Sequence, residues 1–111
     1  MGDCIFCKIV QGELPSEMVF EDDDFIVIRD VAPKVDGHLL VISKRHFEKF
    51  VDMDDGLEAR MLGVVRDVVR KEEIVDFNLV LNNGRIAGQV VDHVHLHILP
   101  REEGDGFVGL V

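Results

Sequence analysis

DHVHLHILP, residues 92–100, alternates histidine with an apolar residue over most of its length. Successive side chains of a β-strand point to opposite faces, so this alternation predicts a strand with one apolar face. We expect the strand to span residues 89–99 and to stop at Pro100, whose nitrogen cannot donate a hydrogen bond. Three histidines would share one face, about 6 to 7 Å apart: His93, His95 and His97. Three apolar residues would share the other: Val94, Leu96 and Ile98.

The row of histidines is unusual for the exposed face of a strand. Imidazoles repel one another once protonated, so such a face would lose stability below about pH 6.5. Histidine clusters more often mark metal binding or catalysis. Either the histidines bind a catalytic zinc that activates water, or the central imidazole, His95, is itself the nucleophile. The row alone leaves both chemistries open, together with a plain half-exposed strand.

The remaining segments predict an α+β fold built on an antiparallel five-stranded sheet. A short helix is expected in CIFCKIVQG, residues 4–12, and Gly12 and Pro15 would end it. The acidic stretch EDDD, residues 21–24, indicates a hairpin turn between the first two strands. Four extended runs precede the histidine strand: residues 17–22, 24–30, 37–43 and 77–84.

One long helix is expected after residue 54, where apolar residues recur at spacings of three and four. Asp54 or Asp55 is available as its N-cap. Arg70 and Lys71 would lie in its last turn, where cations interact favourably with the helix dipole. The recurring apolar positions are Leu57, Met61, Leu62, Val64, Val65, Val68 and Val69.

Length and composition indicate a single domain, residues 1–111, with 47% hydrophobic and 31% charged residues. Asp and Glu outnumber Lys and Arg by 22 to 12, and the formal net charge is −10. Such a surface repels a phosphate backbone, so we expect no nucleic-acid polymer as a partner. The sequence has no signal-peptide pattern and no apolar stretch of membrane-spanning length. We therefore expect no membrane partner and a cytoplasmic location.

The loop NNGRIAGQVVD, residues 82–92, leads into the histidines. Gly84 and Gly88 would let backbone N–H groups approach an anionic oxygen closely. Taken singly, the loop is equally consistent with a plain connection between strands. Beside a nucleophilic histidine, a loop that holds phosphate favours phosphoryl or nucleotidyl transfer.

HVHLHIL resembles the His-x-His-x-His motif of the histidine triad (HIT) superfamily of nucleotide-binding hydrolases and transferases. The resemblance covers nearly the whole chain: CIFCKIVQGELPSEMVFEDDDFIVIRD is similar to the family's amino-terminal segment, GHLLVISKRH to its middle strand and LNNGRIAGQ to its phosphate loop. It implies a HIT-like fold and a homodimer. The chain is most similar to the branch that hydrolyses nucleoside phosphoramidates and related adenylates, which implies a purine nucleotide or nucleoside phosphoramidate as the substrate.

The resemblance also implies roles for individual residues. His95 would attack the α-phosphate and form a nucleotidyl-histidine that water then hydrolyses. His97 and the backbone around Gly88 and Gln89 would hold the phosphate oxygens. His38 corresponds to the family's additional active-site histidine.

The nucleoside would be held by a carboxylate, an amide and an apolar pocket. Asp30 corresponds to a carboxylate that accepts hydrogen bonds from both ribose hydroxyls, which suits an acceptor-only group, although an aspartate before Pro33 is equally suited to capping a turn. Asn82 corresponds to a nucleotide-contacting asparagine. Val90 departs from the family, which commonly has Ser or Thr there, so a hydroxyl facing the phosphate or its leaving group is missing. The base pocket would be formed by residues that could equally be plain core: Ile5, Phe6, Ile9, Ile28 and Val31.

CIFC places Cys4 and Cys7 three residues apart, which suits a metal or redox site better than a disulfide in a reducing compartment. A structural zinc needs four ligands, so two nitrogens must come from histidines. His46 and His93 are the candidates. Some members of the superfamily with this Cys-x-x-Cys hold zinc with the first triad histidine, which leaves His95 free. The alternative is a pair of reduced, buried cysteines that behave as small hydrophobes.

Two rival functions remain open from the sequence. A zinc-dependent hydrolase would use the histidine row as metal ligands. A nucleotide-binding regulatory protein with little catalysis is the non-enzymatic rival, and the valine at position 90 favours it slightly. The preferred hypothesis is a hydrolase that uses a covalent nucleotidyl-histidine and needs no cofactor for the chemistry.

Overall fold

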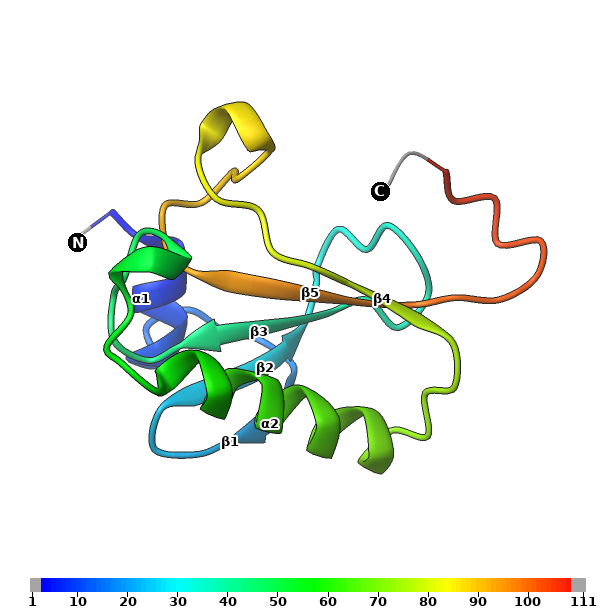
Figure 1. Cartoon of the computed structure of the whole chain (residues 1–111), viewed down its shortest axis with the longest axis horizontal. Coiled ribbons are helices and arrows are strands. Elements are labelled where there is room, and N and C mark those ends of the chain that lie inside the picture. The colour runs from blue at the N-terminus through cyan, green and yellow to red at the C-terminus, as the bar shows by residue number, and fades with distance from the viewer. Residues whose placement is uncertain (1–2, 109–111) are drawn as a thin grey trace.

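The computed structural model describes residues 3–108, which form an antiparallel sheet of five strands in the order β1-β2-β3-β5-β4 with two α-helices (Figure 1). The α+β prediction is therefore confirmed. The helices are α1 (Ile5–Val10) and α2 (Leu57–Lys71), and two short 3-10 helices are η1 (Phe50–Asp52) and η2 (Arg85–Ala87). The strands are β1 (Met18–Glu21), β2 (Phe25–Arg29), β3 (Leu39–Ser43), β4 (Phe77–Val80) and β5 (His95–Pro100). Within residues 3–108, no helix has the length and apolar character that crossing a bilayer requires.

The two faces of the sheet have different coverings. One face packs against α2 through Phe25, Val27, Leu39, Val41, Leu96 and Ile98. The other packs against Phe6 of α1 through Ile26, Ile28, Leu40 and Ile42. His95 is paired with Ile42, and His97 with Leu40. Because directly paired residues share a face, both imidazoles lie on the α1 side of the sheet.

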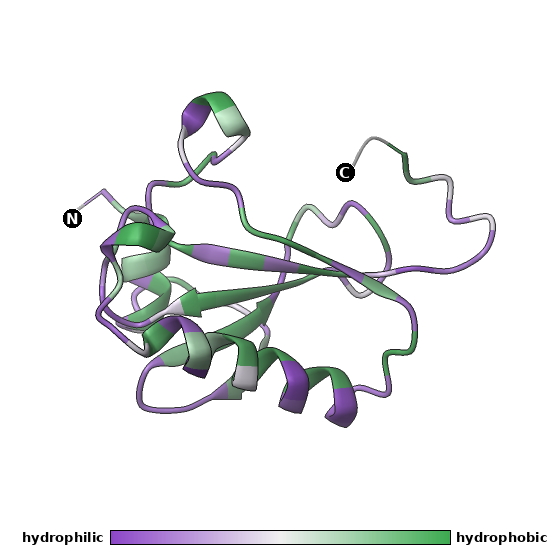
Figure 2. Cartoon of the chain, in the orientation of Figure 1, coloured by the Kyte–Doolittle hydropathy of each residue, from purple (hydrophilic) through white to green (hydrophobic). Residues whose placement is uncertain are grey.

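The alternation that the sequence predicts for β5 is present in the strand. Figure 2 shows β5 changing between hydrophilic and hydrophobic positions, whereas β2 and β3 are hydrophobic along most of their length. Strands β2 and β3 lie in the interior of the sheet and are buried on both faces, so both of their faces are apolar. The histidines of β5 thus occupy positions that the neighbouring strands fill with aliphatic side chains.

The start of α2 differs from the prediction. Neither Asp54 nor Asp55 is the N-cap; Gly56 occupies that position with φ of 88°, and no side chain caps the helix. The Leu57 N–H donates to the Asp54 carbonyl at 3.0 Å, which closes a tight turn before the helix. A left-handed residue is needed in that turn, and glycine adopts this conformation without a Cβ clash. The last turn carries Arg70 and Lys71, as predicted.

The strand around the histidines also begins later than predicted. The expected strand over residues 89–99 is wrong for its first half, because β5 starts at His95. His93 precedes the strand: its own N–H donates to the Val91 carbonyl at 2.8 Å, and the Val94 N–H donates to the Phe47 carbonyl at 2.7 Å. These contacts replace ladder hydrogen bonds. Likewise β4 ends at Val80 rather than at residue 84.

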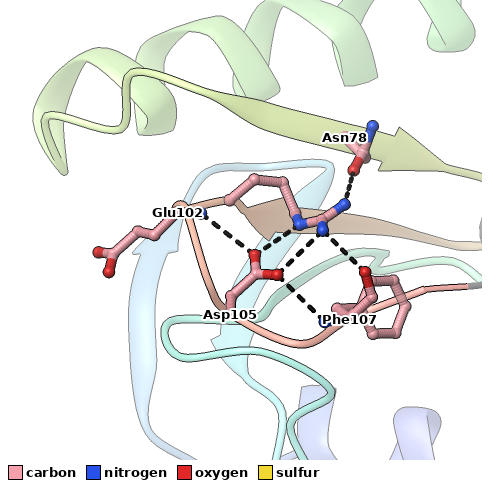
Figure 3. Close-up of polar contacts among 5 residues, drawn as sticks. Asn78, Glu102, Asp105 and Phe107 are labelled. Atoms are coloured by element: carbon pink, nitrogen blue, oxygen red, sulfur yellow. Dashed lines mark hydrogen bonds and ion pairs between the residues drawn. The ribbon is translucent and has the colours of Figure 1, made fainter.

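Arg101 fastens the segment after β5 to the edge of the sheet (Figure 3). Its guanidinium donates to both carboxylate oxygens of Asp105, at 2.8 and 3.1 Å, to Asn78 Oδ1 of β4 at 2.9 Å and to the Phe107 carbonyl at 3.0 Å. The Asp105 carboxylate also accepts the N–H groups of Glu102 and Phe107, both at 3.1 Å. These hydrogen bonds hold the pKa of Asp105 well below its usual range. The Arg101–Asp105 pair is therefore the centre of a hydrogen-bond network that joins the segment through residue 107 to β4.

Candidate active site

Three histidines meet on the α1 face of the sheet. His95 and His97 come from β5, and His38 immediately precedes β3. The ring centroids of His95 and His97 are 5.1 Å apart, as are those of His38 and His97. His38 and His95 are buried, and His97 is partly exposed. The structure thus brings together the three residues that the sequence predicts as catalytic.

The proton of His95 has a defined position. Its Nδ1 lies 2.7 Å from the carbonyl oxygen of His93, so Nδ1–H is the donor. A neutral imidazole has one N–H, and the lone pair is then on Nε2. Burial lowers the pKa of His95 and keeps the ring neutral near pH 7. Phe6 packs edge-on against the His95 ring, with the two ring centroids 4.9 Å apart. This packing and the hydrogen bond at Nδ1 hold the ring in one orientation and so fix the direction of the Nε2 lone pair.

His38 and His97 form a second chain of hydrogen bonds. The Lys34 backbone N–H donates to His38 Nδ1 at 3.2 Å, so the proton of His38 is on Nε2 and is donated to His97 Nδ1 at 2.9 Å. Asp30 Oδ2 also approaches His38 Nδ1, but at the longer distance of 3.5 Å. The Lys34 N–H can only donate, so this closer contact determines the tautomer of His38. Burial lowers the pKa of His38, and burial with its two neighbouring histidines lowers that of His97 to about 4. His97 therefore has its N–H on Nε2, which is left free to donate.

A largely apolar cavity of about 330 Å³ lies beside His95 and His97. It contains all five residues that the sequence predicts for a base pocket: Ile5, Phe6, Ile9, Ile28 and Val31. Its wall also includes Leu14 and Pro15, which the sequence alone does not indicate, because apolar loop residues after a short helix give no chemical signal. Asp30 lies on its rim together with the two histidines.

A second cavity of about 310 Å³ adjoins the first. Asp30, Val90 and His97 line both cavities. Asn82 and Gly88, predicted to contact the nucleotide, line only the second, with Lys34 and apolar residues of β4 and β5. Since three residues are common to both cavities, one elongated ligand can extend from the first to the second past His97.

The loop before β5 is held by the side chain of Gln89. This amide accepts the Gly84 N–H at 2.7 Å and donates to the carbonyls of Glu48 and Val91 at 2.6 and 3.0 Å. Gln89 is buried and lines neither cavity, so its side chain holds the conformation of the loop. In this loop, η2 projects away from the sheet (Figure 1). Gly88 has φ of 98°, which a side chain would strain, and its carbonyl accepts the Asn82 amide at 3.4 Å.

A separate cluster joins α1 to the start of β5. The metal-binding atoms of Cys4, Cys7, His46 and His93 all lie within 4.8 Å of one another. Sγ of Cys4 is 3.3 Å from His93 Nδ1, and Sγ of Cys7 is 3.2 Å from His46 Nδ1. Both cysteines are free thiols. Two sulfurs and two imidazole nitrogens are the ligand set of a closed tetrahedral zinc site.

The surroundings of this cluster also fit a metal. His93 Nε2 donates to the Ser43 carbonyl at 2.7 Å, which leaves Nδ1 as the lone-pair atom beside the sulfurs. Burial and the neighbouring Cys4 raise the pKa of Cys7 to about 11. A divalent cation would reverse that shift, because it stabilises the thiolate. In residues 3–108 the donor atoms of His93, His95 and His97 do not form one metal-binding group, although those of Asp30, His38 and His97 lie within 4.8 Å of one another.

Comparison with known proteins identifies relatives that match nearly the whole chain. The chain is 48% identical over 108 residues to an uncharacterized HIT-like protein of Methanocaldococcus jannaschii, covering 95% of this chain and 84% of that one. It is 40% identical to the adenosine 5'-monophosphoramidase hnt1 of Schizosaccharomyces pombe (96% and 80% covered) and to the adenylylsulfatase HINT3 of Arabidopsis thaliana (94% and 55% covered).

A solved structure is similar over nearly the same length. The zinc-bound histidine triad family protein from Mycobacterium smegmatis superimposes with a TM-score of 0.86 at 35% identity, covering 95% of this chain and 79% of that one. The profile of the family described as "HIT domain" matches residues 11–104. By sequence and by fold, this chain belongs to the HIT domain family.

Proposed function

We propose that this protein is a nucleotide hydrolase that cleaves at the α-phosphate of a purine nucleoside phosphoramidate or related adenylate through a covalent nucleotidyl-histidine on His95. The single observation that carries the proposal is the hydrogen bond from His95 Nδ1 to the His93 carbonyl. It leaves the Nε2 lone pair of a buried, neutral ring beside a cavity of nucleoside size. An imidazole in this state is a nucleophile at neutral pH.

The chemistry would proceed in two displacements. His95 Nε2 forms a bond to the α-phosphorus, the bond from phosphorus to the leaving group breaks, and the leaving group departs with the electron pair. Water then attacks the same phosphorus, releases the nucleoside monophosphate and restores His95. His97 Nε2–H and backbone N–H groups of the loop at Gly88 would stabilise the charge on the phosphate oxygens.

The nucleoside would occupy the apolar cavity. Its base would pack against the Phe6 side of that cavity, and the Asp30 carboxylate would accept the ribose hydroxyls. Asp30 Oδ1 already accepts the Ala32 N–H at 3.0 Å, the turn-capping role that the sequence left open. A carboxylate has several acceptor sites, so capping and ribose binding are compatible. The names of the relatives, an adenosine monophosphoramidase and an adenylylsulfatase, support an adenosine-type substrate.

Zinc at Cys4, Cys7, His46 and His93 belongs to the proposal as a structural ion. A bound zinc would tie α1, which forms the base pocket, to the residues before β5. It would supply no step of the reaction. Cysteines stay reduced in the cytosol and are then available as thiolate ligands, which suits a cytoplasmic location.

The two rival functions are separated by one experiment. Turnover of adenosine 5'-phosphoramidate is measured with and without a chelator, and folding is followed by circular dichroism. A histidine nucleophile keeps most of its rate per folded molecule after chelation, whereas a zinc-dependent hydrolase loses all of it. No turnover by the folded protein would favour the regulatory rival and contradict the proposal.

Val90 gives a prediction about the leaving group. Val90 is 87% exposed and lines both cavities, at a position where the resemblance to the family implies Ser or Thr. A hydrogen bond to a developing charge contributes about 1 to 3 kcal/mol. Val90→Ser is therefore expected to raise turnover of poor-leaving-group adenylates about tenfold or more, and of good ones much less.

The measurement is a series of adenosine phosphoramidates of graded amine basicity, assayed on wild type and on Val90→Ser. Val90→Ala is the matched control, since it shortens the side chain without adding a hydroxyl. If the dependence on amine basicity is the same for all three proteins, position 90 does not address the leaving group.

A homodimer through the β4 edge is the assembly we propose. β4 ends the sheet, and its Phe77 and Leu79 are more than a third exposed. Leu79 pairs with Ile98, whose side chain faces α2, so Leu79 lies on the α2 side of the sheet. Leu62 of α2 is also exposed. An unpaired strand edge flanked by apolar side chains is a ready surface for a second copy.

Leu79→Lys is expected to dissociate this dimer, because a charged side chain on each copy would be buried in the shared surface. Sedimentation velocity measures the outcome. Val51→Lys places the same charge on an exposed apolar position in η1 and is the matched control. An unchanged sedimentation coefficient for Leu79→Lys would contradict the β4 interface.

A further inference from the structure

The free thiols of Cys4 and Cys7 lie in different surroundings. Cys7 is buried, with 6% of its surface exposed, whereas Cys4 is partly exposed. Cys4 also lines a third cavity, of about 460 Å³, together with His46 and residues of the loop before β5. A small solute in this cavity therefore approaches the thiol pair from the side of Cys4.

The two sulfurs are placed to react with each other. Cys4 is the N-cap of α1 and Cys7 lies in its first turn, where the Cys7 N–H donates to Cys4 Sγ at 3.4 Å. The sulfurs are no more than 4.8 Å apart, and both contact His93 Nδ1, Cys4 at 3.3 Å and Cys7 at 3.6 Å. Residues three apart are neighbours on one helix face, so a disulfide between them needs only local adjustment.

The thiol pair is in contact with the residues that form the nucleotide site. Phe6, which lies between the two cysteines in the chain, lines the apolar cavity and packs against the His93 and His95 rings at centroid distances of 5.9 and 4.9 Å. The ring of His93 contacts both sulfurs, and its carbonyl accepts the Nδ1–H of His95. A movement of either sulfur is therefore transmitted directly to the base pocket and to the proposed nucleophile.

We propose that Cys4 and Cys7 form a redox switch: a hydroperoxide converts the thiol pair to a reversible disulfide, and the oxidised protein binds nucleotide more weakly. The switch goes beyond the proposed function and takes from it only that the nucleoside occupies the apolar cavity. Disulfides of cytosolic proteins are usually transient and serve catalysis or redox sensing. Redox-sensing cysteines are accessible to solvent and lie next to a resolving cysteine, as Cys4 and Cys7 do.

The oxidation has two steps. The Cys4 sulfur attacks one oxygen of hydrogen peroxide, the oxygen–oxygen bond breaks, one water leaves and Cys4 becomes a sulfenic acid. The Cys7 sulfur then attacks the Cys4 sulfur, the sulfur–oxygen bond breaks, and hydroxide leaves with the Cys7 thiol proton as a second water. The two sulfurs lose two electrons in total, and the peroxide gains them. Dithiothreitol reverses the reaction by thiol–disulfide exchange.

The disulfide would also remove half of the ligands from the proposed zinc site. Thiolates bind metal, and a disulfide has none, so only His46 and His93 of the four ligands would remain. Two ligands do not make a closed structural site. Oxidation would therefore free a bound zinc and release α1 from the residues before β5.

The test uses untagged wild type in reduced, peroxide-treated and re-reduced forms. Mass spectrometry of the denatured protein should show the loss of two hydrogens on oxidation, and peptide mapping should place the new bond between Cys4 and Cys7. A chromogenic chelator should detect the release of about one zinc per chain. Isothermal titration should show that oxidation weakens binding of adenosine monophosphate about tenfold, and that dithiothreitol with zinc restores it.

Nucleotide should in turn oppose oxidation. Ile5, Val90 and Val91 line both the apolar cavity and the third cavity, so a nucleoside packs against residues that border the approach to Cys4. In glutathione redox buffers, saturating adenosine monophosphate should make the disulfide about tenfold less favourable, because the two equilibria share one coupling free energy. For a two-electron couple this factor raises the midpoint potential by about 30 mV.

Two variants separate the switch from general oxidative damage. Cys7→Ser lacks the resolving thiol, so peroxide should leave a sulfenic acid on Cys4 that dimedone traps. Cys4→Asp replaces one thiolate with a carboxylate, which can also bind zinc, and it cannot form the disulfide. Its affinity for adenosine monophosphate should change less than about twofold with peroxide. Since it keeps every methionine, it is the matched control for oxidation elsewhere in the chain.

Each of four results would overturn the switch. The first is peroxide-treated wild type without a bond between Cys4 and Cys7. The second is an equal loss of affinity in Cys4→Asp, which would trace the effect to other residues. The third is equal affinity of reduced and oxidised wild type, which leaves the proposed function standing. The fourth is reduced, folded wild type that binds no adenosine monophosphate, in which case the switch and the proposed function both fail.

Discussion

His95→Ala is expected to lower kcat/KM by about a thousandfold or more while nucleotide affinity changes by less than about tenfold. The variant loses the only imidazole whose Nε2 lone pair is oriented by the His93 carbonyl. It keeps the apolar cavity, Asp30 and the loop at Gly88, which would bind the nucleotide. Turnover of an adenylate and isothermal titration with adenosine monophosphate measure the two effects separately.

The expected split between rate and affinity is the informative part of that result. His97 cannot replace His95, because His97 Nδ1 accepts from His38 and only its N–H is free. Turnover by His95→Ala within tenfold of wild type would contradict the assignment of the nucleophile.

Cys4→Ser is expected to lower the melting temperature by about 10 to 20 °C, with a much smaller effect on rate per folded molecule. The reason is that loss of one thiolate opens a four-ligand site that would hold α1 against the residues before β5. Purified untagged wild type should contain about one zinc per chain. Elemental analysis and calorimetry measure both quantities.

Chelator-treated wild type is the control for Cys4→Ser, because it loses the metal and keeps all four ligand side chains. Wild type stripped by a chelator should melt at nearly the temperature of Cys4→Ser, and added zinc should restore only the wild type. Absence of zinc from the untagged protein, or a melting temperature that chelation leaves unchanged, would contradict the zinc site. Cys4 and Cys7 would then be reduced cysteines that pack as small hydrophobic side chains.

Much of the fold could be predicted because its strongest signals are periodic. The alternation in residues 95–99, the three- and four-residue spacing after Leu57 and the acidic turn before Phe25 each specify an element by local geometry. The predicted boundaries are wrong where contacts between segments distant in the sequence, rather than local residue preferences, determine the backbone conformation. Gly56, rather than an aspartate, begins α2 because the turn there needs a left-handed residue.

The same reason explains the shortened β5. Gln89 bonds to Gly84, Glu48 and Val91, and these contacts hold residues before His93 out of the sheet. The sequence offers no measure of such long-range partners. Alternation continued to residue 93, so the strand prediction extended too far.

The candidate site was only partly accessible from the sequence. The histidines and CIFC carry residue types with distinctive chemistry, so they could be identified and related to the HIT family. The tautomers of His95 and His38 could not be predicted, because they depend on the His93 carbonyl and the Lys34 N–H. Only folding brings these backbone groups against the two rings.

The most direct test of the account is the mass of the intact protein, measured within seconds of mixing with an adenylated substrate and kept at neutral or alkaline pH to protect a phosphorus–nitrogen bond. A covalent nucleotidyl-histidine on His95 predicts an added adenylyl group on part of the wild-type protein, located at His95 by fragmentation and missing from His95→Ala. Turnover by wild type with an adenylyl group on a different residue, or the same adduct on His95→Ala, would contradict it.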